Sequence, residues 1–119
     1  MGARAQTADP SGGPRLAVII DDLGYLRHEG LRALELPGRL TYGFLPHTPH
    51  GRELADLAFA LGKEVMLHLP MESHHGRRLG PGGLTKLMDR GAVHETVRAS
   101  LLAVPYVQGV VSKWVSVAS

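Results

Sequence analysis

Residues 16–22 read LAVIIDD, a short apolar run that ends in two aspartates. The run is continuous and rich in β-branched side chains, which predicts a strand buried on both faces in a parallel sheet. We expect Asp21 and Asp22 to end this strand at its carboxyl end. Residues 65–69 read VMLHL and precede a proline, a pattern that predicts another buried strand with His68 near its carboxyl end.

Helical and strand patterns alternate along the rest of the chain. The apolar spacing predicts a helix from the first strand to residue 36, a strand over 39–45, a helix over 51–61, a helix from 89 or 91 to about 103, and a strand over 107–111. This alternation favours right-handed β-α-β units around a parallel sheet or barrel. We therefore expect an α/β fold that forms part of a (β/α) barrel. Three or four strands are too few to close a barrel, so one sheet edge should be exposed and the barrel truncated.

The composition indicates one modest globular domain and excludes several kinds of site. The chain has 119 residues, 44% of them hydrophobic, and its 13 basic and 11 acidic side chains leave a formal net charge of +2. Because the basic residues form no run of five, a nucleic-acid partner is not expected. The absence of cysteine excludes disulfides, thiolate metal sites and a cysteine nucleophile.

The amino-terminal segment differs in composition from the remainder of the chain. Residues 1–14 contain Pro, Gly, Ser and Thr, and we expect them to form a disordered lead-in or linker ahead of a domain over residues 15–119. The segment has no apolar stretch of the length that a signal peptide or a membrane span requires. We therefore expect no membrane span in this chain.

Three side chains form a candidate metal site. Parallel β-α-β winding would bring Asp21, Asp22 and His68 to the same rim of the sheet, because all three follow the carboxyl ends of strands. A hydrolytic metal uses carboxylate and imidazole ligands, and a neighbouring carboxylate can act as general base. In a regular strand the two aspartates would point to opposite faces, which favours one ligand and one base. The alternative is that the aspartates cap the next helix and that His68 is a hydrogen-bonded core histidine.

Other motifs give weaker indications of function. His74 and His75 are adjacent in a glycine-rich loop, and we interpret them as surface residues because consecutive side chains diverge. His47 and His50 flank a Thr-Pro pair that prevents helical alignment, so ligation by them is not favoured. The glycines in GPGG lie outside any nucleotide-binding pattern, and the serine-hydrolase motif Gly-x-Ser-x-Gly is absent from the sequence.

Five segments occur in an order and spacing that resemble the divergent polysaccharide deacetylase family: AVIIDDLGY, LTYGFLPHTPHGRELADLA, GKEVMLHLPMES, GPGGLT and VPYVQGV. The resemblance covers nearly all of residues 15–110. It implies a distorted (β/α) barrel, usually exported to the bacterial envelope, with a divalent metal such as zinc held by an aspartate and two histidines. It also implies that Asp21 is the base that activates water, that Asp22 and His68 are metal ligands, and that the substrate is an N-acetylated polysaccharide.

The sequence departs from the family pattern near its carboxyl end. The family continues with a segment of the type Asn-Asn-His-Met-Gly-Ser, whereas this chain has VSKWVS, with Lys113 in the place of the third ligand. A protonated lysine cannot donate a lone pair to a metal and repels it, so we expect metal affinity to fall sharply. A frameshift near residue 110 or a truncated gene model would explain the departure. The sequence thus predicts an impaired deacetylase-like protein. The alternatives are a non-catalytic carbohydrate-binding or envelope-interaction module and an α/β fragment without a function of its own.

Overall fold

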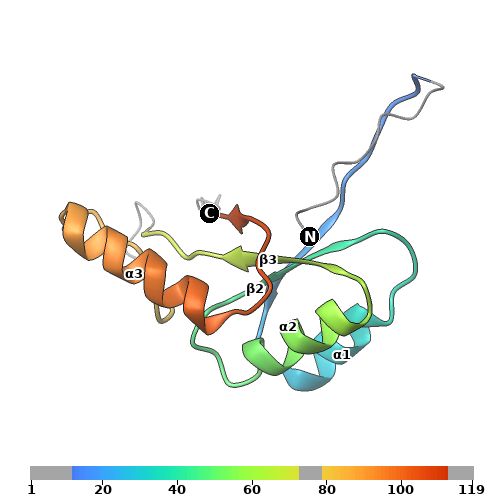
Figure 1. Ribbon diagram of the computed structural model, residues 1–119, viewed down its shortest axis with the longest axis horizontal. Helices are drawn as coiled ribbons and strands as arrows, with labels where there is room; N and C mark the ends of the chain where they lie inside the picture. The colour runs from blue at the N-terminus through green and yellow to red at the C-terminus, as the bar shows by residue number, and fades with distance from the viewer. Residues whose placement is uncertain (1–11, 73–78, 113–119) are drawn as a thin grey trace, which may run out of the picture.

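The computed structural model describes residues 12–72 and 79–112, and the order of its elements is the one that the sequence predicts (Figure 1). Four strands alternate with three helices. The elements are β1 (Ile19–Leu23), α1 (Arg27–Leu34), β2 (Thr41–Phe44), α2 (Gly51–Ala60), β3 (Glu64–His68), α3 (Arg90–Ala103) and β4 (Val110–Val111).

The four strands form one parallel sheet in the order β1-β2-β3-β4, so each strand lies beside its neighbour in the sequence. Helices α1 and α2 lie together on one face of the sheet (Figure 1). Sequential winding with helices on a single face is the arrangement of a (β/α) barrel, whereas a doubly wound sheet reverses its strand order and places helices on both faces. The predicted fold class, part of a (β/α) barrel, is confirmed, with β1 and β4 at the two edges of the described sheet.

The core lies between the sheet and helices α1 and α2. Tyr42 and Phe44 alternate with Gly43 along β2, and both aromatic side chains are fully buried. The hydroxyl of Tyr42 donates a hydrogen bond of 2.7 Å to the carbonyl oxygen of Ala33 in α1, which shows that this side of β2 faces the helices. Further core side chains come from β3 and from both helices: Val65, Leu67, Leu34, Leu54, Ala55 and Ala58.

The bounds of β1 correct the prediction for the first strand. The aspartates were expected to end a strand over residues 16–20, but β1 begins at Ile19 and contains both of them. Pairing with β2 starts at Ile19, opposite Thr41, and resumes at Leu23, opposite Phe44. Residue Leu16 is 89% exposed, because the apolar run begins ahead of the pairing partner that would bury it.

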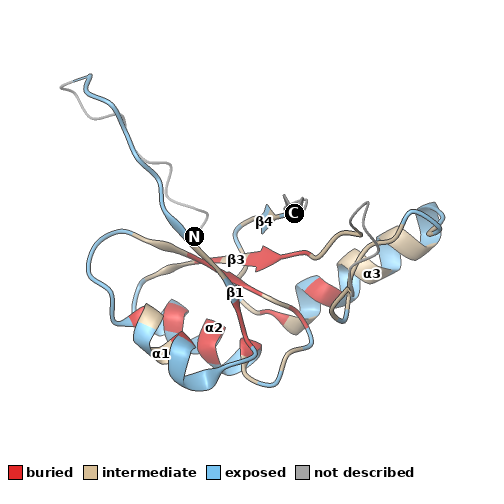
Figure 2. Cartoon of the chain, turned by 180° about the vertical axis from the view of Figure 1, so that it is seen from behind, coloured by how far each residue is buried: buried red, intermediate tan, exposed pale blue. Residues whose placement is uncertain are grey.

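Helix α3 extends from one end of the sheet, away from α1 and α2 (Figure 2). It starts as predicted after Asp89, whose side chain accepts a hydrogen bond of 2.8 Å from the backbone nitrogen of Ala92. Among its described residues only Ser100 is buried, and Leu102 is 70% exposed. None of the helices in the described part of the chain has the length and apolar character needed to cross a membrane.

Candidate metal centre

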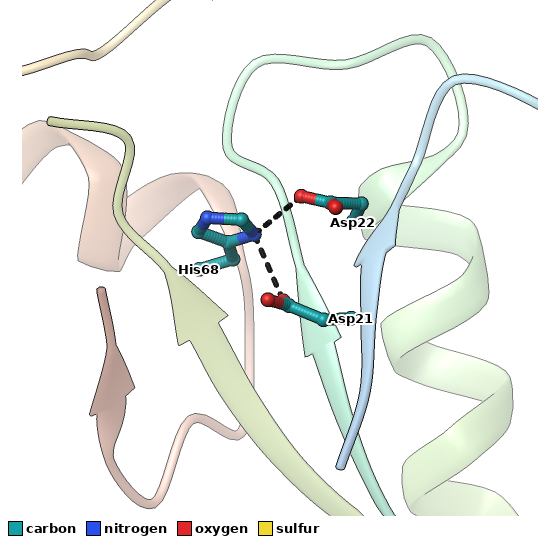
Figure 3. A group of neighbouring side chains, drawn as sticks. All are labelled: Asp21, Asp22 and His68. Atoms are coloured by element: carbon teal, nitrogen blue, oxygen red, sulfur yellow. Dashed lines mark ion pairs between the residues drawn. The ribbon is translucent and has the colours of Figure 1, made fainter. Parts of the chain in front are cut away.

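The structure brings Asp21, Asp22 and His68 together at the carboxyl rim of the sheet (Figure 3). His68 is the last residue of β3, both aspartates belong to β1, and β2 lies between these two strands. The Nδ1 atom of His68 lies 2.8 Å from Oδ1 of Asp21 and 2.8 Å from Oδ1 of Asp22. One ligand atom from each of the three side chains lies within 4.8 Å of the other two.

A bulge in β1 allows two consecutive aspartates to reach the same histidine. The register with β2 shifts between Ile20 and Leu23, and Asp22 adopts a left-handed backbone conformation with φ of 62°. Bulges re-aim side chains and are frequent beside active sites. The expectation that Asp21 and Asp22 point to opposite faces is therefore wrong for this strand, because it assumed regular geometry.

Burial differs strongly within the cluster. The side chain of His68 is 6% exposed, that of Asp21 is 16% exposed and that of Asp22 is 56% exposed. Two carboxylate oxygens approach the buried Nδ1 of His68, yet no group in the described residues meets hydrogen-bond geometry with that atom. One N–H at Nδ1 cannot satisfy two carboxylates fully, whereas a cation beside the cluster would be coordinated by carboxylate and imidazole atoms of the kind present here. The donor set therefore fits a divalent metal such as zinc.

The structure bears on one part of the alternative interpretation, the capping of the next helix. Helix α1 has Leu26 at its N-cap position and no side-chain capping hydrogen bond, so the aspartates do not cap it. His68 is buried, and its Nδ1 lies 2.8 Å from a carboxylate oxygen of each aspartate. The three side chains form one polar group on the sheet rim.

Gly43 in β2 is a part of this site to which the sequence analysis gave no role. A Cβ atom built on Gly43 would lie 2.5 Å from Oδ1 of Asp21 and 3.4 Å from Cγ1 of Val111. The missing side chain therefore leaves the space that the Asp21 carboxylate occupies. A glycine inside a strand often marks a close approach, and the sequence TYGF carried this signal.

The remaining histidines lie apart from the described cluster or outside the described residues. His47 follows β2 and is exposed, and Nδ1 of His50 lies 3.9 Å from Oε2 of Glu53, which also pairs with Arg27. Neither histidine belongs to the group of potential metal ligands found among the described residues. His74, His75 and Lys113 fall outside the described ranges, so the predictions for them stay predictions.

Comparison with known proteins identifies the family. Residues 18–115 match the family described as divergent polysaccharide deacetylase. The chain belongs to this family. The resemblance seen in the sequence segments is confirmed, since the match covers most of the chain and includes all three residues of the cluster.

Two curated proteins are similar to this chain in sequence. The chain is 34% identical over 96 residues to the uncharacterized protein YibQ of Escherichia coli, covering 81% of this chain and 30% of YibQ. It is 27% identical over 86 residues to an uncharacterized protein of Haemophilus influenzae, covering 72% of this chain and 31% of that protein. The chain thus spans about a third of the length of these curated relatives.

A crystal structure of an uncharacterized protein from Agrobacterium tumefaciens has the same fold. Its TM-score is 0.75 at 22% sequence identity, over 82% of this chain and 41% of that chain. At this identity the similarity concerns the fold alone.

Proposed function

We propose that this chain forms part of a metal-dependent polysaccharide deacetylase, with Asp22 and His68 as metal ligands and Asp21 as the general base. The observation that carries the proposal is the convergence of two carboxylate oxygens on the buried Nδ1 of His68. Family membership supports a polysaccharide as the substrate. We further propose that this polysaccharide is N-acetylated and belongs to the cell envelope.

Each residue of the cluster has a role that suits its environment. His68 is held by burial at the end of β3, and its Nδ1 donates a lone pair only in the tautomer that is protonated on Nε2. Asp22 is the most exposed of the three and presents a carboxylate oxygen on the solvent side. When bound, a divalent ion supplies a Lewis acid that polarises the acetyl carbonyl. Asp21 accepts the proton of the attacking water, as a carboxylate beside the reacting centre can do.

The described cluster contains one histidine, and we therefore expect its affinity for a metal to be low. A hydrolytic zinc site commonly has three protein ligands and an open position. If Lys113 replaces the third ligand, the chain binds zinc weakly and releases acetate slowly. We therefore propose an impaired form of the parent activity for this chain.

Metal titration of the full chain tests the ligand assignment. We expect zinc binding by isothermal titration calorimetry, and we expect Asp22→Ala and His68→Ala to abolish it. Asp21→Asn should retain binding but lose acetate release from an N-acetylated oligosaccharide, because the amide cannot accept the proton. Asp56→Ala and His50→Ala are matched controls outside the cluster and should bind zinc as the unmodified chain does.

Two outcomes would contradict the proposal in different ways. Full-strength zinc binding by both Asp22→Ala and His68→Ala would show that the ligands are wrong. Glycan binding by a chain that takes up no zinc would instead favour the non-catalytic carbohydrate-binding module.

A further inference from the structure

Gly43 lies at the centre of the surface that carries the metal centre. It is the third residue of β2, and its register partner in β3 is Met66. Because Tyr42 and Phe44 face the helices, Gly43 faces the opposite side of the sheet, where the Asp21 carboxylate lies over it. Gly43 is therefore placed between the strand that provides the aspartates and the strand that provides His68.

We propose that Gly43 is a positioning residue for Asp21: the absence of a side chain at this position lets the Asp21 carboxylate lie across β2 and reach His68. The catalytic role of Asp21 in this inference rests on the proposed function. The geometry on which it depends, the distance of 2.5 Å between a Cβ at residue 43 and Oδ1 of Asp21, is independent of any metal.

The surroundings of Gly43 decide which group would move if a methyl group were added. The backbone of β2 is held on both sides, by pairing of Tyr42 with Ile20 and by pairing of Gly43 with Met66. On the face of the sheet away from the helices, a Cβ atom added to Gly43 would lie 3.4 Å from Cγ1 of Val111, which is already van der Waals contact. The flexible end of the Asp21 side chain is the group that can move, and it moves by turning away from Nδ1 of His68.

Gly43→Ala should therefore preserve the fold and displace the general base. We expect acetate release by the full chain to fall at least about tenfold, the size of effect that disturbed positioning beside a metal site commonly has, with kcat reduced and KM unchanged. Zinc binding should be retained, as expected for Asp21→Asn, because the assigned ligands Asp22 and His68 are unchanged. Gly109→Ala is the matched control, because its Cβ would meet only the flexible end of Met66, at 3.1 Å, on the neighbouring strand.

A double-mutant cycle on the metal-free chain tests the inference without relying on activity. Gly43→Ala should lower the midpoint of chemical unfolding in the Asp21 background and should lower it much less in the Asp21→Ala background, where the clash is gone. Gly109→Ala should lower the midpoint equally in both backgrounds. Equal effects of Gly43→Ala in the two backgrounds would overturn the inference.

The experiments separate failure of the inference from failure of the proposed function. A chain that binds no zinc, but shows the expected coupling between residues 43 and 21, would overturn the metal site and leave the positioning role intact. A chain that binds zinc and shows no coupling would do the reverse. If Gly43→Ala alone does not fold, recovery of folding in Gly43→Ala/Asp21→Ala supports the inference, and continued failure to fold contradicts it.

Discussion

The hydroxyl of Tyr42 links β2 to the first helix. The side chain is fully buried and donates a hydrogen bond of 2.7 Å to the carbonyl oxygen of Ala33. Burial raises the pKa of this phenol from its ordinary value of 10.0, because the charged phenolate loses its solvation. The folded protein therefore keeps Tyr42 neutral at pH values where an unfolded chain ionises it.

Stability should fall at alkaline pH through this residue. A raised folded-state pKa means that the stabilising contribution is complete below the unfolded pKa near 10 and is lost as pH rises toward the folded pKa. We expect Tyr42→Phe to cost about 1 kcal/mol of unfolding free energy at pH 7, from the lost hydrogen bond. Urea denaturation at pH 7 and at pH values above the unfolded pKa should show this difference shrinking. Tyr25→Phe, at an exposed position, is the control, and a pH-independent difference for Tyr42→Phe would contradict the prediction.

At the scale of one element, the bulge in β1 places the Asp22 carboxylate beside His68 and leaves the backbone of Asp22 in a strained conformation. Asp22 has φ of 62°, a conformation that costs a residue with a Cβ atom about 1–2 kcal/mol. The strained residue is also one of the two that present a carboxylate oxygen to His68. Strained backbone of this kind is often found at functional sites.

Two substitutions at Asp22 separate strain from the function of its carboxylate. Both Asp22→Ala and Asp22→Gly remove the carboxylate, but only glycine adopts a positive φ without cost. We expect Asp22→Gly to be more stable than Asp22→Ala by about 1 kcal/mol in metal-free chemical denaturation. The opposite order is expected at Asp56, in the interior of α2, where glycine is the worse residue. Equal stabilities of the two Asp22 variants would show that the bulge is not strained.

The sequence predicted the elements better than it predicted the details of the site. Apolar runs such as VMLHL are local signals, and the order of strands and helices was predicted from them. The extent of β1 depends instead on where β2 provides a pairing partner, which is a long-range property. The bulge at Asp22 arises from this pairing of β1 with β2. The sequence analysis assumed a regular strand and therefore predicted that the two aspartates point to opposite faces. The meeting of the aspartates with His68 could be predicted because parallel winding brings strand ends to one rim.

At the scale of the whole molecule, the proposed metal centre brings together residues from strands that are not neighbours. Asp21 and Asp22 lie in β1 and His68 lies in β3, with β2 between them. Helices α1 and α2 cover one face of the sheet (Figure 1). Asp21 lies over Gly43 on the opposite face, away from the core between the sheet and these helices. A bound ion would connect β1 to β3 across Gly43.

Metal binding should therefore stabilise the whole described sheet. An ion that binds only the folded chain adds about 2.7 kcal/mol to the unfolding free energy at 100 times its dissociation constant. We expect zinc to raise the unfolding midpoint of the full chain and a chelator to return it to the metal-free value. His68→Ala should show no shift, while His50→Ala should behave as the unmodified chain does. If zinc binds in calorimetry but leaves the midpoint unchanged, the ion does not distinguish the folded from the unfolded chain and therefore does not join β1 to β3.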